Sequence, residues 1–319
     1  MFRIFGPPGT GKTTTLLDLV DKALENGAAP TEIAFLAFTR KAATEARERA
    51  SQRFGLDPRR DLPYFRTLHS LAFRLTGLTT EQLMSGEHYK ELEKRTGFEL
   101  TGSSRADEEA TAAIKKEAEI LRLITLSRLK RTPLRVEYHG TRIKHTWTEV
   151  DYLARALEKY KKTNGLFDYT DMLELFVQKG PKICPHFELC LLDEAQDLSP
   201  IQWEIANILD NKSEKMYCAG DDDQAIFGFA GSQIEHFINL PGGAEILEQS
   251  YRVPSTIHAL ATNISSRIRR RYPKKYLPRK EKGSVQRIFS VEQLDFSKGN
   301  WLVMSQAHYQ TNPVAEHLK

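Results

Sequence analysis

The sequence predicts an α/β protein in which a parallel sheet is interrupted by a helical insertion. Three observations carry this prediction. A short apolar run at 2–5 leads through a glycine-rich loop into a helix pattern. Apolar strand runs and helix patterns then alternate, stop near residue 77 and return near residue 166. The stretch between them has few β-branched runs and several polar helix patterns, which indicates a separate small domain.

The glycine-rich loop after the first strand has the pattern Gly-x4-Gly-Lys-Thr. Glycines let backbone N–H groups turn inward around phosphate oxygens, and the helix N-terminus adds its positive dipole end. Lys12 is expected to reach the β- and γ-phosphates, and the Thr13 hydroxyl to take one Mg²⁺ position. A Gly-Pro turn before a helix is the structural alternative, but the flanking patterns favour nucleotide binding. The predicted nucleotide-binding residues are Gly6, Pro7, Pro8, Gly9, Thr10, Gly11, Lys12, Thr13 and Thr14.

The next elements follow from periodicity and end signals. The first helix pattern ends at Asn26-Gly27, a strand follows at 33–38, and a charged helix at 41–53 is closed by Gly55. A strand end passes into a helix within 64–75. One strand, helix and parallel strand already imply a sheet that binds ligands at the carboxyl ends of its strands.

Two helices of the insertion have visible start signals. Ser104 precedes Asp107 at the start of a helix through Arg128, and Thr148 precedes Asp151 at the start of one through Lys162. The α/β pattern then returns with strands at 187–192 and 215–219, and Ser199-Pro200 opens a helix between them. Further strands are predicted at 285–290 and 301–305.

Composition narrows the class of protein. The chain has 319 residues, of which 28% are charged and 40% apolar, and it shows neither a membrane-length apolar run nor a secretory leader, so we expect a cytoplasmic protein. Cys184, Cys190 and Cys218 have spacings that fit neither a zinc site nor a disulfide frame, and we interpret them as reduced, mostly buried thiols. The net charge of +4 permits a nucleic-acid partner. The basic run 267–282 is either a phosphate-binding surface or a solvated helix end.

An acidic pair completes a set of groups suited to phosphoryl transfer. Asp193 follows an apolar strand, where a carboxylate that holds a metal would face the loop, and Glu194 could accept the proton of an attacking water. An ordinary acidic turn is the alternative when the pair is taken alone. With the phosphate loop upstream, the catalytic interpretation is preferred.

Six runs follow one another along the chain: 37–43 (AFTRKAA), 67–69 (TLH), 166–171 (LFDYTD), 193–197 (DEAQD), 220–224 (GDDDQ) and 249–252 (QSYR). In this order they resemble motif Ia, the Thr-Phe-His element, the motif that re-enters the first motor domain, and motifs II, III and IV of superfamily 1 DNA helicases of the UvrD, Rep and PcrA type.

The resemblance implies a fold, a function and residue roles. It implies a RecA-like first motor domain at 1–76 and 166–247, an insertion domain at 77–165 and the start of a second RecA-like domain at 248–319. It implies ATP hydrolysis with Mg²⁺ held by Thr13 and Asp193, coupled to 3′-to-5′ movement on single-stranded DNA or a junction by a monomer that works with repair or replication proteins. The implied catalytic residues are Lys12, Glu194, Gln224 as γ-phosphate sensor and Arg252 as arginine finger, with Tyr251 on the adenine. The implied DNA contacts are Phe38, Thr39, Arg40, Thr67, His69, Phe227 and Phe229.

Aromatic faces that stack on any base give grip without sequence preference, which suits these DNA roles. Core packing remains the alternative for Phe38, Phe227 and Phe229. The chain departs from the family pattern in having Thr14 beside the adenine and Ala230 after the motif III aromatic, and in lacking the upstream glutamine element and motifs V and VI. Two alternatives therefore stay open: a nucleotide-gated DNA-binding subunit with little turnover, and an unrelated phosphate-loop ATPase.

Overall fold

The computed structural model describes residues 1–100, 119–305 and 308–318, and its centre is a six-stranded sheet. All neighbouring strands run parallel, in the order β3-β2-β4-β5-β1-β6, which confirms the predicted α/β class. The strands are β1 (Phe2–Phe5), β2 (Ile33–Ala37), β3 (Phe65–Thr67), β4 (Phe187–Leu192), β5 (Ser213–Gly220) and β6 (Ala244–Ile246).

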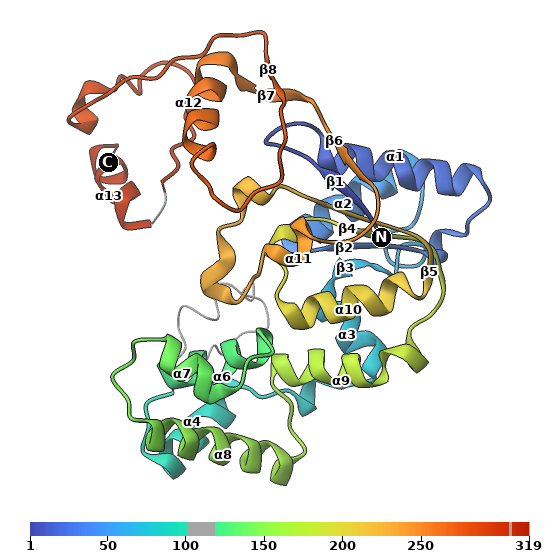
Figure 1. Cartoon of the computed structure of the whole chain (residues 1–319), viewed down its shortest axis with the longest axis vertical. Helices are drawn as coiled ribbons and strands as arrows, with labels where there is room; N and C mark the ends of the chain where they lie inside the picture. The colour runs from blue at the N-terminus through green and yellow to red at the C-terminus, as the bar shows by residue number, and fades with distance from the viewer. Residues whose placement is uncertain (101–118, 306–307, 319) are drawn as a thin grey trace.

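Helices cover both faces of the sheet (Figure 1). Alternate residues of a strand point to opposite faces, so Ile33 and Phe35 join one apolar cluster while Ala34 and Leu36 join the other. The first cluster is completed by α1 (Lys12–Glu25) and α2 (Arg40–Phe54). The second is completed by α3 (Leu68–Thr76), α9 (Tyr169–Ile183) and α10 (Pro200–Asp210).

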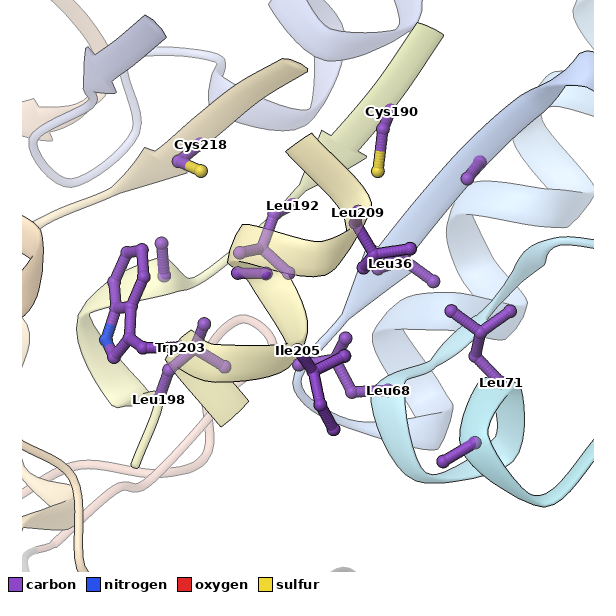
Figure 2. Close-up of a cluster of buried hydrophobic side chains, with 14 of the residues drawn as sticks. Leu36, Leu68, Leu71, Cys190, Leu192, Leu198, Trp203, Ile205, Leu209 and Cys218 are labelled. Carbon is purple, nitrogen blue, oxygen red and sulfur yellow. The ribbon is translucent and has the colours of Figure 1, made fainter. Parts of the chain in front are cut away.

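The second cluster is the larger core and contains the cysteines. Figure 2 shows Leu68 and Leu71 of α3 and Ile205 and Leu209 of α10 around Leu36 and Leu192 of the strands. All three cysteines are free and buried, as the sequence indicated. Burial raises the pKa of the Cys184 thiol to about 11, so it stays protonated at neutral pH. Among the described residues no helix has the length and apolar character needed to cross a membrane.

The insertion between α3 and α9 has a core of its own (Figure 1). Leu92, Ile120, Val150 and Leu157 are among its buried members. The predicted start at Ser104 lies outside the described residues. The helices here are α4 (Gly86–Thr96), α6 (Glu119–Leu129), α7 (Leu134–Gly140) and α8 (Trp147–Asn164).

The predicted cap of α8 is wrong by two residues. The helix is capped by Thr146, whose side chain accepts from the backbone N–H of Glu149, while Glu149 reaches back to the Thr146 N–H at 2.6 Å. Thr148 therefore lies inside the helix. Trp147 stands at the first helical position and packs edge-on against Tyr138, with ring centroids 5.5 Å apart. That contact fixes the earlier start.

A buried ion-pair network joins the insertion to α9. Arg128 of α6 bonds to Asp168 at 2.7 Å and to Glu174 at 3.0 Å, and it also pairs with Asp171. The Lys161 ammonium is 2.8 Å from both Asp168 and Asp171, and its side chain is only 4% exposed. The two nearby cations lower the pKa of Asp168 despite its burial.

The chain after β6 forms a second, two-stranded sheet of β7 (Gln249–Pro254) and β8 (Leu277–Arg279). The strands predicted at 285–290 and 301–305 are wrong, because both segments lie outside helices and strands and are largely exposed. β8 lies instead within the basic run. The remaining helices are α11 (Glu235–Ile238), α12 (Ser255–Ser265) and α13 (His308–His317).

Candidate nucleotide and nucleic-acid site

The residues predicted to act together lie at one edge of the six-stranded sheet. The phosphate loop follows β1, the DEAQD run follows β4, and the GDDDQ run begins at the end of β5. Phe38 follows β2, and Thr67 ends β3. Because all these strands are parallel, their carboxyl ends meet on the same side, which is where open α/β sheets bind ligands.

The phosphate loop is held in shape by its own bonds and by the neighbouring strand. The Gly6 N–H donates to the Gly220 carbonyl at 2.9 Å, and the Thr10 hydroxyl donates to the Pro7 carbonyl at 2.8 Å. The Lys12 ammonium turns back and donates to the Gly6 carbonyl at 3.0 Å. A Cβ at Gly6 would come within 1.9 Å of Lys12 Cγ, so only glycine leaves room for that path. The loop thus presents Lys12 where phosphate oxygens would replace the carbonyl.

Thr13 and Asp193 meet as the metal hypothesis requires. The Thr13 side chain hydrogen-bonds to Asp193, which is 5% exposed. Burial and the neighbouring Glu194 raise the pKa of Asp193 to about 6. A hydroxyl and a buried carboxylate supply the oxygen ligands that Mg²⁺ prefers, so the residues present fit this ion.

Glu194 lies between the loop and the strand ends in a strained conformation. Its φ of 54° and ψ of 43° are left-handed, which is uncommon outside glycine and asparagine. Its Oε2 atom is 3.8 Å from Lys12 Nζ and accepts from the Gln196 side chain at 3.0 Å. The carboxylate is half-buried and therefore open to a water molecule.

Gln196 links motif II to motif III. Its Nε2 donates to both Glu194 and Asp197, at 3.0 Å each, and its Oε1 accepts from the Asp221 N–H at 3.0 Å. Asp221 in turn accepts from the Gln224 side chain at 2.5 Å. Gln196 and Asp221 therefore connect the predicted sensor Gln224 to the predicted base Glu194.

Asp197 is a buried carboxylate with an incomplete set of partners. Its Oδ2 accepts from Gln196, while its Oδ1 has no hydrogen-bond partner among the described residues. Burial, followed by the charge of Glu194, raises the pKa of Asp197 to about 7. Asp197 is therefore partly protonated at neutral pH, beside the residue proposed as base.

β7 lies directly on the phosphate loop. The Tyr251 N–H donates to the Gly9 carbonyl at 2.9 Å, and the Ser250 hydroxyl donates to the Pro8 carbonyl at 2.7 Å. Gly9 has a φ of +73°, and a Cβ there would come within 2.3 Å of Arg252 Cβ. The Arg252 backbone thus touches the loop while its side chain is exposed. Tyr251 is 74% exposed and Thr14 is also exposed, so both stand open to a ligand.

The three predicted aromatic residues form one row. The ring centroids of Phe38 and Phe227 are 5.3 Å apart, and those of Phe227 and Phe229 are 6.0 Å apart. Phe227 and Phe229 lie in a 3₁₀ turn at 227–230. Phe38 packs partly against the core, whereas Phe229 is 39% exposed. Core packing therefore accounts for part of the Phe38 contacts, while the Phe229 ring remains partly accessible.

The polar residues predicted to touch DNA lie at helix starts. Thr39 caps α2 by accepting from the Ala42 N–H, and Thr67 caps α3 by accepting from the Ser70 N–H. Burial, with the charge of Arg40 nearby, lowers the pKa of His69 to about 4, so the imidazole is neutral at pH 7. These helix starts open on the same sheet edge as the phosphate loop.

Sequence reasoning assigned no roles to Gln196, Ser250 or Lys274. Gln196 and Ser250 lie within the runs that resemble motifs II and IV, and only the contacts in the structure show what their side chains do. Lys274 was part of the basic run, whose signal was charge density alone. The Nζ atom of Lys274 lies 3.1 Å from Oδ1 of Asp221, although the two residues are far apart in the sequence.

Comparison with known proteins bears on the same residues. The sequence model of the UvrD/REP helicase N-terminal domain matches residues 2–242. DNA helicase II of Escherichia coli (strain K12) is 31% identical over 82% of this chain and 38% of its own length. The putative ATP-dependent DNA helicase YjcD of Bacillus subtilis (strain 168) is 27% identical over 83% of this chain and 36% of its own. The ATP-dependent DNA helicase PcrA of Leuconostoc citreum is 25% identical over 94% and 41% respectively.

This chain spans less than half the length of each of these relatives. The family match nevertheless covers the whole described sheet apart from β6, together with the phosphate loop and motifs II and III. The chain belongs to the UvrD/REP helicase family and carries that family's N-terminal domain.

Proposed function

We propose that this chain is the ATP-binding portion of a DNA helicase, which hydrolyses ATP to ADP and phosphate and couples that reaction to 3′-to-5′ movement on single-stranded DNA. The observation that supports it best is the link from base to sensor. Glu194 is 3.8 Å from Lys12 and bonds through Gln196 to Asp221, which bonds to Gln224. Hydrolysis and its sensing thus share one network.

The side chains divide the chemistry between them. Lys12 places a positive charge where the γ-phosphoryl oxygens gain charge, which lowers the barrier electrostatically. Glu194 is half-exposed and fixed by the Gln196 amide, so it can orient a water and accept its proton. Thr13 and Asp193 would hold Mg²⁺, which neutralises charge on the β- and γ-phosphates. Arg252, carried by β7, would add a second cation, and Tyr251 an adenine contact.

The DNA path follows from the aromatic row and the helix starts beside it. Phe38, Phe227 and Phe229 offer stacking surfaces, while Thr39 and Thr67 place backbone N–H groups and hydroxyls at the same edge. Arg40 supplies positive charge and neutral His69 a hydrogen-bonding group. Stacking on aromatic faces gives sequence-independent affinity of about 1–3 kcal/mol per base.

The proposed division into domains follows the packing. Residues 1–76 and 166–247 build the six-stranded sheet and its helices, residues 77–165 hold the helical insertion, and residues 248–319 begin a second RecA-like domain. Separate apolar clusters for the sheet and the insertion support this division. The position of β7 on the phosphate loop suits a cleft that closes over nucleotide.

The test is steady-state ATP hydrolysis by the 319-residue chain with and without oligo(dT), with Glu194→Gln as the control for contaminating ATPases. We expect DNA to raise kcat severalfold, and the increase to vanish in the control. Lys12→Ala should weaken nucleotide binding itself, measured with a fluorescent ADP analogue. Hydrolysis that ignores DNA, or that survives Glu194→Gln, would contradict the proposal.

A second candidate is a nucleotide-gated DNA-binding subunit with little turnover by itself. It predicts tight, salt-sensitive binding of oligo(dT) that depends on bound nucleotide, with negligible hydrolysis. Multiple turnovers by the chain alone would exclude it. Streptavidin displacement from 5′-biotinylated DNA, by a chain continued to its relatives' length, would test the direction of movement.

A further inference from the structure

A buried lysine just before β8 contacts the aspartates of motif III (220–224). The Lys274 side chain is 1% exposed, and its ammonium lies 3.1 Å from Asp221 and 3.0 Å from Asp223, with Asp222 as a third partner. Asp221 and Asp222 are themselves almost fully buried. One cation therefore stands at the centre of three consecutive carboxylates.

Two residues close to Lys274 in the sequence bond to the same run of aspartates. Arg271 holds Asp223 with two bonds, Nε to Oδ1 at 2.9 Å and Nη2 to Oδ2 at 2.7 Å. The Tyr272 N–H donates to Asp222 at 2.6 Å, and the Tyr272 ring stacks on Phe5, with centroids 4.0 Å apart and planes 9° apart. Phe5 ends β1, immediately before the phosphate loop. The segment 271–274 is thus anchored at the ends of two central strands.

One of the aspartates that Lys274 holds, Asp221, also contacts two glutamines. Asp221 accepts from the Gln224 side chain at 2.5 Å, and its N–H donates to Gln196 at 3.0 Å. Gln196 then bonds to Glu194 at 3.0 Å. A continuous chain of contacts runs from Lys274 through Asp221 and Gln196 to the Glu194 carboxylate.

Electrostatics explains why the lysine sets this geometry. Three adjacent carboxylates repel one another, and Lys274, with Arg271 on Asp223, offsets that repulsion. Without Lys274, the buried Asp221 and Asp222 lose the cation that holds them close together. Asp221 is the one whose movement would release Gln224, because its carboxylate is bonded to both the lysine and the glutamine.

We propose that Lys274 is a positioning residue for ATP hydrolysis: it fixes the run 221–223, and through Asp221 it sets both the Gln224 amide and the Gln196 amide, of which the latter orients Glu194. This inference rests on the proposed function. It assigns to the basic run a role in turnover, distinct from phosphate binding. If Lys274 has this role, hydrolysis also depends on whether the segment 271–274 is in contact with motif III.

The test compares Lys274→Met with Lys275→Met, a matched change at the exposed neighbouring lysine. We expect Lys274→Met to lower kcat at least tenfold, while KM and the dissociation constant for a fluorescent ADP analogue stay within twofold. Lys275→Met should match the parent. Equal losses in kcat and nucleotide affinity, or no loss, would overturn the proposal.

A double mutant separates positioning from general loosening. Because Lys274 acts partly through Gln224, Lys274→Met should lower kcat by a smaller factor in a Gln224→Ala background than in the parent. Multiplicative losses would overturn the proposal. If Lys274→Met does not fold, Arg271→Gln replaces it, because it frees one side of Asp223 and leaves the lysine in place. It must then lower kcat at unchanged nucleotide affinity.

A readout without turnover distinguishes failure of this proposal from failure of the proposed function. Hydrogen exchange of the amides at 194–198 and 220–225 should speed up in Lys274→Met, while exchange in α1 stays unchanged. Faster exchange confined to 271–279 would overturn the positioning role, whatever the chain hydrolyses. Conversely, if the parent chain has no ATPase activity, the proposed function is rejected. The exchange pattern then still tests whether Lys274 holds the residues at 194–198 and 220–225 in place.

Discussion

The Nζ atom of Lys12 lies 3.8 Å from the Oε2 atom of Glu194, so the residue proposed to hold phosphate and the residue proposed to take a proton already face each other. The pair is too long for a strong bond, and Lys12 instead donates to the Gly6 carbonyl at 3.0 Å. An incoming γ-phosphate would compete for Lys12 with a backbone carbonyl. Glu194 is meanwhile held by Gln196, so its position does not depend on the lysine.

We expect Glu194→Gln to lower kcat for ATP hydrolysis by about 10²–10⁴-fold, because an amide keeps the shape of the side chain but cannot accept a proton. Binding of a fluorescent ADP analogue should stay within a few-fold of the parent. The comparison is single-turnover hydrolysis against equilibrium binding on the same preparation. A variant that hydrolyses ATP at the parent rate would show that Glu194 is not the base.

Gly9→Ala should disturb the contact between β7 and the phosphate loop. A φ of +73° costs a residue with a side chain about 1–2 kcal/mol, and the new Cβ would meet Arg252 Cβ at 2.3 Å. The matched control is Gly27→Ala, whose φ of +92° carries the same penalty with nothing within 4 Å. Urea denaturation and nucleotide titration should both show a larger loss for Gly9→Ala. Equal losses would contradict the contact.

Arg128→Met should destabilise the junction between the insertion and α9. It leaves Asp168, Asp171 and Glu174 short of a buried cation, and breaking such a network costs about 3–5 kcal/mol. Arg155→Met is the control, because its pair with Asp151 lies at the surface and is worth under about 1 kcal/mol. Thermal melting read by circular dichroism compares them. Similar melting temperatures for both variants would show that the network adds little.

Asp197→Asn should change how stability depends on pH. The folded pKa of Asp197 is about 7, against 3.8 for the ordinary carboxyl, so the native state holds an extra proton between about pH 4 and 7. The free energy of unfolding therefore falls as pH rises through this window. The variant should be more stable than the parent at pH 8, by on the order of 4 kcal/mol, and lose that advantage at pH 4. Urea denaturation at both pH values measures the difference, and a constant difference would refute the assignment.

Much of the fold could be predicted because its central strands are continuous apolar runs that end in polar motifs. The strand at 187–192 was predicted with the bounds that the structure shows, and the charged helix at 41–53 differs from α2 by one residue at each end. Gly55 closes α2 with a φ of 66°, as the sequence indicated. Strands that are buried on both faces are continuous apolar runs in the sequence, which is why this part of the fold could be predicted.

The remaining differences arise where the decisive partner is distant in sequence. Thr146 and Thr148 each stand three residues before an acidic residue, and the packing of Trp147 on Tyr138 decides between them. The apolar residues at 285–290 suggested a strand, but a strand needs a neighbour to pair with. Lys274 shows the same limit in the site, because its charge was visible and its burial among aspartates was not.

Only two residues, Leu247 and Glu248, separate β6 in the main sheet from β7 on the phosphate loop. The Leu247 N–H is tied to the Phe5 carbonyl at 2.8 Å, so the free length of this tether is shorter still. This short connection keeps Arg252 near the phosphate loop. If Arg252 acts on the γ-phosphate as proposed, its effective concentration there would be high, and its approach to the nucleotide would need no diffusive search.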